Sequence, residues 1–479
     1  MSKAIRVAIF GAGPAGIYAG NILANSYPEV TIDLFDLLPA PYGLIRYGVA
    51  PDHPRIKGIV NSLHEMLDSG NIRFFGNVEF GKDITLADVR KHYHAVIFAT
   101  GAIKDAQLNI QGIDLDGSFG AADFVSWYDG HPDVPRTWPL TAEKVAVLGN
   151  GNVALDVARM LAKQADDLLT TDVPANVYEG LKASPVTDVH VFGRRGPAAI
   201  KFSPIELREL GEVNDLDIVL YDEDFPEGWF NEEHEGVTNQ HRVMARVLQS
   251  WRDREQTGAK RRLHLHFWSK PVAITGTDGK VSGMQFERTA PAPGAAGENC
   301  INGSVVGTGD IRNYDLQAVY RAIGYWGSEL PEVPYNYESG VIRNEGGRVV
   351  TAEGTQVAGL YATGWIKRGP IGLIGHTKSD AMETIENLVA DVPNLVDPEV
   401  DSTDELLAEL DARGVEYTTW QGWNALNAHE LSMGEKYGVV PSRPHNADKS
   451  VNGGVVEVPR ERVKVVDRNE QIQISRAAQ

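Results

Sequence analysis

Short, almost wholly apolar runs alternate with stretches of helical period along this chain, and the arrangement occurs twice. Residues 5–10 and 31–35 are apolar runs on either side of a helical pattern over 17–23. Residues 144–148 and 188–192 repeat the arrangement farther along. Runs that are apolar on both faces are typical of parallel strands covered by helices. The pattern therefore predicts an α/β protein with two Rossmann-like units.

A glycine-rich turn joins the first apolar run to its helix. Gly11-Ala12-Gly13-Pro14-Ala15-Gly16 has the GxGxxG spacing, and Asp36 ends the next predicted strand. The glycines permit a tight turn, close approach of a pyrophosphate and close packing of the helix, whose N-terminus attracts phosphate. Asp36 lies 20 residues after Gly16, where a carboxylate can accept hydrogen bonds from ribose hydroxyls. The segment predicts a dinucleotide site suited to FAD; the alternative is a tight turn only.

The second unit has a related turn with a different charge beside it. Gly149-Asn150-Gly151-Asn152-Val153-Ala154 follows the GxGxxA variant, and Gly193-Arg194-Arg195-Gly196 ends the next predicted strand. A carboxylate at that strand end would repel a 2′-phosphate, whereas guanidinium groups bind one through paired hydrogen bonds. The second site is therefore predicted to bind NADPH rather than NADH. The alternative for the two arginines is a solvated loop pair.

Composition narrows the function classes. The chain has 479 residues, which predicts two domains, and a formal net charge of −20, which disfavours nucleic acid and anionic lipid. Cys300 is the single cysteine, so an internal disulfide, a redox dithiol and an iron–sulfur ligand set are excluded. No apolar run is long enough to span a bilayer, and a strand is predicted from residue 5, so the cytoplasm is the expected location.

Four longer stretches resemble the adrenodoxin reductase family of ferredoxin–NADP reductases, and the similarity runs from residue 5 to about 445. They are 39–54 (PAPYGLIRYGVAPDHP), 149–159 (GNGNVALDVAR), 193–197 (GRRGP) and 364–372 (GWIKRGPIG). The resemblance implies an FAD-dependent enzyme that moves hydride from NADPH to flavin N5 and then single electrons to a ferredoxin-like iron–sulfur protein. One departure is Asp36, where the family often has glutamate.

The resemblance also implies that the NADP domain is inserted into the FAD domain. The stretches 95–101 and 359–364 both end in Ala-Thr-Gly, as expected where the chain crosses between domains. We expect residues 1–105 and 325–479 on the FAD side, with a loose tail after about 445, and residues 106–324 on the NADP side. The polar stretch 166–185 is expected to be a surface excursion.

Contact residues follow from the two turns and from the resemblance. His53 and Glu209 are expected beside the flavin as candidates for catalytic proton transfer; the alternative for His53 is a structural loop histidine. Trp365 is expected to contact FAD or else to be a core aromatic residue. Glu206 either touches NADP or closes a capping box that begins at Ser203. The FAD contacts are Gly11, Gly13, Pro14, Ala15, Gly16, Asp36, Leu44, Val78, Trp365, Gly372, Leu373 and Ile374, and the NADP contacts are Gly149, Asn150, Gly151, Asn152, Val153, Ala154, Arg194, Arg195, Glu206 and Gly372.

A basic stretch suggests where the protein partner docks. Residues 242–262 contain seven arginines and lysines and two acids, a local charge of +5 in a chain of −20. Arg242 and Arg246 are four residues apart and would share one face of a helix. Such a face can steer an acidic ferredoxin, and the resemblance places partner-binding arginines here. The alternative is a solvated helix face.

Three other functions are consistent with parts of the pattern. A disulfide reductase with two dinucleotide sites needs a dithiol, and the electron-input subunit of glutamate synthase carries cysteine-bound clusters; one cysteine supplies neither. A non-catalytic NADP(H)-binding flavoprotein or redox-sensing module would bind the nucleotides without passing electrons on. Bleaching of the flavin by NADPH distinguishes that module from an enzyme.

Overall fold

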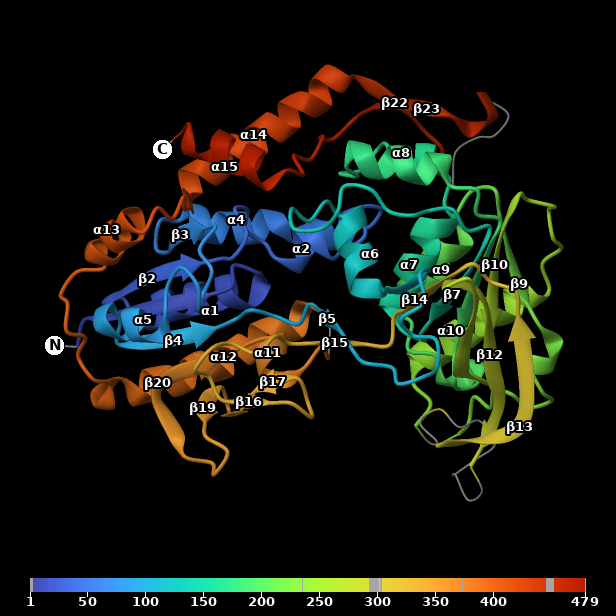
Figure 1. Ribbon diagram of the computed structural model, residues 1–479, viewed down its shortest axis with the longest axis horizontal. Helices are drawn as coiled ribbons and strands as arrows, with labels where there is room; N and C mark the ends of the chain where they lie inside the picture. The colour runs from blue at the N-terminus through green and yellow to red at the C-terminus, as the bar shows by residue number, and fades with distance from the viewer. Residues whose placement is uncertain are drawn as a thin grey trace.

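The computed structural model describes residues 3–234, 236–292, 301, 304–371, 374–444 and 452–478. Within them the chain forms two α/β units, each built around its own sheet, and Figure 1 shows the units side by side. One sheet has the strand order β18-β19-β20-β4-β1-β2-β3-β21 and the other the order β6-β14-β7-β8-β10-β9. The predicted fold class is confirmed.

The first sheet draws its strands from both ends of the chain. Its parallel strands are β1 (Ile5–Phe10), β2 (Val30–Phe35), β3 (Arg73–Gly76), β4 (Ala95–Phe98) and β20 (Gln356–Ala362). The edges are β18 (Asn344–Glu345) and β19 (Arg348–Val350) on one side and β21 (Thr418–Thr419) on the other. Val7 and Ile9 lie in the core that includes α1 (Pro14–Ser26), whereas Ala8 and Phe10 lie in the core on the opposite face. Burial on both faces explains the unbroken apolar runs.

The second sheet lies wholly within the middle of the chain. Its strands all run parallel and are β6 (Ser118–Gly120), β7 (Lys144–Leu148), β8 (Asp188–Phe192), β9 (Leu216–Leu220), β10 (Arg261–His266) and β14 (Ala318–Arg321). An antiparallel sheet of β11 (Ser269–Thr277), β12 (Lys280–Pro291) and β13 (Val305–Tyr314) packs beside it, and the two share the core that contains Leu148 and Phe286.

The two crossings between the units lie side by side. The short strands β5 (Lys104–Asp105) and β15 (Tyr325–Trp326) pair in antiparallel fashion. The N–H of Ala106 donates to the carbonyl of Gly324 at 2.9 Å. The middle unit is therefore an insertion whose entry and exit are hydrogen-bonded to each other.

The prediction of a loose tail is wrong for residues 452–478. This part contains β23 (Val456–Pro459), which pairs with β22 (Val439–Ser442), and α15 (Arg468–Arg476), which packs on α14 (Trp420–Tyr437). The side chain of Lys464 is 1 % exposed and lies 2.9 Å from Asp172 of the middle unit. Figure 1 shows this segment running along both units. Its buried residues include polar ones with distant partners, so apolar periodicity does not reveal it.

The predicted surface excursion at 166–185 is also wrong. The stretch includes the end of a 3-10 turn at Ala165–Leu168 and the helix α8 (Ala175–Ala183). Leu168, Val173 and Val177 are fully buried in the core of the middle unit. Among the helices that the structure describes, none has both the length and the apolar composition needed to cross a membrane.

Candidate active site

The first glycine turn lies at the carboxyl end of β1 and is closed by backbone contacts. Gly11 has φ 110°, and a Cβ there would lie 2.3 Å from the carbonyl oxygen of Ala99. A Cβ on Gly16 would lie 1.9 Å from the carbonyl oxygen of Gly11. Gly13 caps α1, and Pro14 and Ala15 begin the helix. The turn leaves the first N–H groups of α1 free for a pyrophosphate, as a dinucleotide requires.

Asp36 is held against this turn. Its carboxylate accepts hydrogen bonds from the N–H of Ala12 at 2.6 Å and of Leu38 at 2.8 Å. Burial raises the pKa of Asp36 to about 6, although both N–H groups act in the opposite direction. The N–H of Val78 donates to the Asp36 carbonyl at 2.9 Å, so Val78 also borders the turn. A carboxylate has further lone pairs, which can accept ribose hydroxyls.

Two distant segments complete the first site. A Cβ on Gly364 would lie 2.6 Å from the Cβ of Ala15, which places Trp365, the first residue of α11 (Trp365–Arg368), next to the turn. Trp365 is partly exposed, which does not fit a plain core aromatic residue. A Cβ on Gly43 would lie 3.0 Å from the Cα of Gly13, and Leu44 begins α2 (Leu44–Tyr47) there. Gly372 and Leu373 lie outside the described residues, as does the side chain of Ile374, where α12 (Ile374–Asp391) begins.

The second glycine turn has the same construction at the carboxyl end of β7. Gly149 has φ 150°, and a Cβ there would lie 2.2 Å from the carbonyl oxygen of Ala322 and 3.1 Å from the Cβ of Ala154. Gly151 caps α7 (Asn152–Ala162), and a Cβ on it would meet no atom within 4 Å. The helix N-terminus is therefore open, as a phosphate ligand requires.

The asparagines of this turn brace it against the next segment. The carbonyl of Asn150 accepts the N–H of Lys201 at 2.9 Å. The Asn152 Oδ1 accepts the N–H of Ser203 at 2.8 Å. Val153 is partly buried on the core of the middle unit. The turn is thereby fixed to the segment that carries Glu206.

Arg194 and Arg195 follow β8, next to the second turn. Hydrogen bonds hold their backbones in place, while the Arg194 side chain is exposed and the Arg195 side chain is partly exposed. The Arg194 carbonyl accepts the Thr289 hydroxyl at 2.7 Å, and the Arg195 carbonyl accepts the N–H of Trp268 at 3.1 Å. Among the described residues, no hydrogen bond or ion pair involves either guanidinium. Two guanidinium groups that have no partner among the residues described, beside a dinucleotide turn, fit a 2′-phosphate.

His53 lies where the two units meet and is surrounded by carboxylates of the middle unit. Its Nε2 is 2.8 Å from Asp156 and 3.0 Å from Glu206, and its Nδ1 is 2.9 Å from Glu209. The His53 side chain is 3 % exposed and that of Glu209 is 33 % exposed. Burial lowers the pKa of His53, but hydrogen bonds to the three carboxylates outweigh it and raise the pKa to about 11. These hydrogen bonds favour the protonated ring against the opposing charge of Arg159, and Glu209 links the ring to solvent.

The capping-box alternative for Glu206 is half right. The hydroxyl of Ser203 accepts the N–H of Glu206 at 3.2 Å at the start of α9 (Pro204–Gly211). The Glu206 carboxylate turns away from the helix start and contacts His53 at 3.0 Å and Arg159 at 3.5 Å. Glu206 therefore belongs to the cluster between the units.

Sequence reasoning missed Asp52, Asp156 and Arg159. The guanidinium of Arg159 is bonded to Asp52 through Nε at 2.8 Å and through Nη2 at 2.9 Å, and Asp156 lies 3.0 Å from Nη2. A signal was present, because Asp52 adjoins His53 and because Asp156 and Arg159 share one face of the helix after the glycine turn.

The residues of the predicted basic patch do not all lie on one exposed surface. Arg261 is 8 % exposed and donates to the Lys163 carbonyl, and Arg262 pairs with Asp188 at 2.7 Å on β10. The count of +5 therefore does not describe one surface. Arg242 and Arg246 do lie one turn apart on α10 (Asn239–Arg252), where Arg242 is partly exposed and Arg246 is exposed.

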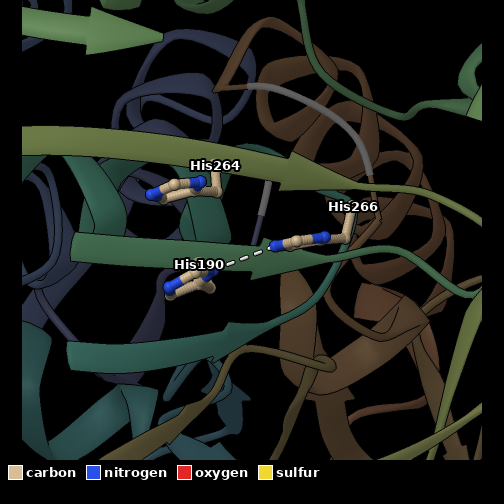
Figure 2. Close-up of side chains that lie close together, drawn as sticks. All are labelled: His190, His264 and His266. Atoms are coloured by element: carbon tan, nitrogen blue, oxygen red, sulfur yellow. Dashed lines mark hydrogen bonds between the residues drawn. The ribbon is translucent and has the colours of Figure 1, made fainter. Parts of the chain in front are cut away.

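Three histidines form a second cluster, the histidine column (His190, His264 and His266), on the middle sheet. His190 and His264 lie opposite each other on β8 and β10, with ring centroids 4.2 Å apart and planes inclined by 12°. Figure 2 shows all three rings lying nearly parallel, with the His190 Nδ1 hydrogen-bonded to the His266 Nε2 at 2.9 Å. Both nitrogens of His264 are engaged, by Asp188 and by Tyr221, each at 2.8 Å. The stacking and the hydrogen bond hold the three rings together as one packed cluster.

The histidine column predicts sensitivity of the fold to acid. Burial, and then the charge of His264, lowers the pKa of His190 to about 3, and burial also lowers the pKa of His264 and His266. The unfolded chain takes up protons below about pH 6.5 while the folded column does not, so stability falls as pH drops from 6.5 towards 3. We expect His190→Asn to recover roughly 2 kcal/mol of that loss at pH 4.5. Denaturant unfolding at pH 7 and pH 4.5 measures the free energy of unfolding, with His429→Asn on α14 as the control. If both variants lose the same free energy of unfolding between pH 7 and pH 4.5, the prediction is contradicted.

Comparison with known proteins bears on this geometry. Residues 5–179 match the family described as pyridine nucleotide-disulphide oxidoreductase. The chain is 35 % identical to the NADPH-ferredoxin reductase FprA of Mycobacterium tuberculosis, over 90 % of this chain and 95 % of the relative. It is 33 % identical to the mitochondrial NADPH:adrenodoxin oxidoreductase of Arabidopsis thaliana, over 90 % of this chain and 92 % of the relative. The solved structure of M. tuberculosis FprA in complex with NADPH superposes with a TM-score of 0.86 and 33 % identity, covering 99 % of this chain and 100 % of that one.

Two Rossmann-like units, each with a glycine turn, define a flavoprotein oxidoreductase that binds FAD and NADP(H). The dithiol that a disulfide reductase of this class needs is excluded by the single cysteine. The chain belongs to the family of NADPH–ferredoxin reductases of the adrenodoxin reductase type.

Proposed function

We propose that this chain is an NADPH:ferredoxin oxidoreductase with FAD at the first glycine turn and NADPH at the second. One observation carries the assignment: the two turns have the same backbone construction, but Asp36 stands beside the first and Arg194 and Arg195 beside the second. A carboxylate suits a ribose with free hydroxyls, and arginines suit a ribose 2′-phosphate.

The residues divide the work of binding, orienting and proton handling. When bound, FAD supplies the chemistry, because it accepts a hydride and can release electrons one at a time. The N-termini of α1 and α7 would hold the two pyrophosphates, and Trp365 would border the flavin. His53 holds a proton between the two sites, and the partly exposed Glu209 can exchange that proton with water.

We propose that the chain has two domains. Residues 1–105 and 325–479 form the domain that binds FAD, and residues 106–324 form the domain that binds NADP. The pairing of β5 with β15 at these boundaries supports it, since few residues connect the units there. The cytoplasm is the proposed compartment, supported by a composition that does not rely on disulfides.

We propose that the ferredoxin-like partner docks on the face of α10 that carries Arg242 and Arg246. These arginines are four residues apart in the helix, and neither belongs to an ion pair among the described residues. In a chain of net charge −20, a local positive face orients an acidic partner that the rest of the surface repels.

The test is NADPH-dependent reduction of cytochrome c, which we expect only when ferredoxin is added. Arg242→Glu with Arg246→Glu should raise the KM for ferredoxin by about 10-fold and weaken its salt dependence, because steering is lost. Ferricyanide reduction should stay unchanged. The control is Lys280→Glu with Lys436→Glu, which makes the same change in charge at two exposed residues, one at the start of β12 and one on α14. An equal rise in the control would place docking elsewhere, and a flavin that NADPH does not bleach would instead indicate a non-catalytic module.

A further inference from the structure

Arg159 joins the two units through a pair of hydrogen bonds to one carboxylate. It lies on α7, two turns after Gly151, and its side chain is 2 % exposed. Its guanidinium is bonded through both Nε and Nη2 to Asp52 of the other unit, at 2.8 and 2.9 Å. Lys163, which caps the C-terminal end of α7, reaches the same carboxylate at 2.9 Å.

Asp52 belongs to the segment that begins at Gly43, where the chain packs against the first glycine turn. Gly43 packs on Gly13, α2 follows at once, and the chain then reaches Ala50 and Asp52. The helix that begins at the second turn is thus bonded to the segment that packs against the first turn. One arginine–aspartate pair spans both cofactor sites.

The charges and the planar shape of the two groups make the Arg159–Asp52 pair a rigid link between the units. Burial opposes ionisation of Asp52, but Arg159 and Lys163 outweigh it and hold the pKa of Asp52 well below its usual range. A planar guanidinium and a carboxylate joined by two hydrogen bonds fix both distance and orientation. Arg159 also lies 3.0 Å from Asp156 and 3.5 Å from Glu206, so the same group orders the cluster between the sites.

We propose that Arg159 is a positioning residue: its paired hydrogen bonds to Asp52 set the placement of the NADP helix relative to the FAD site. The proposal rests on the proposed function, because it concerns how the nicotinamide is presented to the flavin. It predicts that loosening the pair changes the rate of flavin reduction far more than the binding of either nucleotide, whose own contacts are retained.

The test uses Arg159→Lys, which keeps the charge and loses the fork, and Asp52→Asn, which keeps the shape and loses the charge. We expect both variants to retain FAD, and flavin reduction at saturating NADPH to slow by about 10- to 100-fold, as misplacement of reactants by about 1 Å does. The dissociation constant for NADP⁺ should change by less than about threefold, because the phosphate contacts remain. Amide hydrogen exchange should rise in α7 and in residues 50–57, a readout that does not depend on turnover.

Arg443→Lys is the matched control. Arg443 makes a similar paired contact with Asp167, at 2.9 and 3.0 Å, outside the cofactor sites. We expect the rate of flavin reduction in this variant to be unchanged. If Arg159→Lys loses FAD, Lys163→Met provides a milder variant, because it removes only the second cation that contacts Asp52. It should also slow the reduction of the flavin. Variants that reduce at the wild-type rate, or that slow only as much as the control, would overturn the proposal. A wild-type flavin that NADPH does not reduce would instead overturn the proposed function.

Discussion

Replacing Arg194 and Arg195 together with alanine is expected to raise the KM for NADPH by about 100-fold and that for NADH by less than about threefold. Hydrogen bonds to charged groups contribute about 1.5–3 kcal/mol each, and only NADPH carries the 2′-phosphate that these guanidinium groups would bind. Neither guanidinium takes part in an ion pair among the described residues, so their removal should not disturb the fold. Steady-state kinetics with both nucleotides measures the ratio.

A matched control separates specific phosphate binding from loss of positive charge. Arg254→Ala with Lys260→Ala removes two cations from the same unit, between α10 and β10. We expect this control to leave the preference for NADPH unchanged. Equal rises of KM for NADPH and NADH in the Arg194 and Arg195 variant would remove the 2′-phosphate assignment.

Gly16→Ala is expected to abolish FAD binding. The added Cβ would lie 1.9 Å from the carbonyl oxygen of Gly11, and both groups belong to a turn that has no flexible side chain to move aside. Either α1 shifts away from β1 or the turn opens, and the unfolding free energy should drop by at least about 3 kcal/mol. The ratio of flavin to protein absorbance and the thermal midpoint measure the two effects.

Gly58→Ala provides the comparison on the same unit. Gly58 has φ −59°, and its Cβ would approach no atom closer than 3.4 Å, so this variant should bind FAD normally. Retention of FAD by Gly16→Ala with an unchanged thermal midpoint would show that the first turn tolerates a side chain, and the FAD assignment would lose its main steric argument.

The two turns and the cluster between them suggest a common logic for this enzyme. In the proposed function, each nucleotide is held mainly by backbone groups and a few side chains of its own unit. The groups between the sites, His53 with Glu209 and Arg159 with Asp52, come from both units and depend on how the units meet. Binding and reduction should therefore respond separately to substitution.

The amino-acid sequence by itself determined the features that depend on nearby residues. In each unit the apolar run (5–10 or 144–148), the glycine spacing after it and the acid or arginines at the next strand end lie within about 50 residues of one another. Backbone sterics and helix-terminus electrostatics act over that range, so the two sites and the choice between FAD and NADPH could be predicted.

Only the tertiary structure decided which polar side chains meet. Arg159 and Asp52 are 107 residues apart, and Lys464 and Arg46 are separated by 418. Arg261 looked like part of a basic surface and is buried, whereas the segment after residue 452 looked loose and packs on both units. Buried polar partners carry no periodic signal in the sequence, because each is satisfied by a group that only the packed fold brings within hydrogen-bond reach.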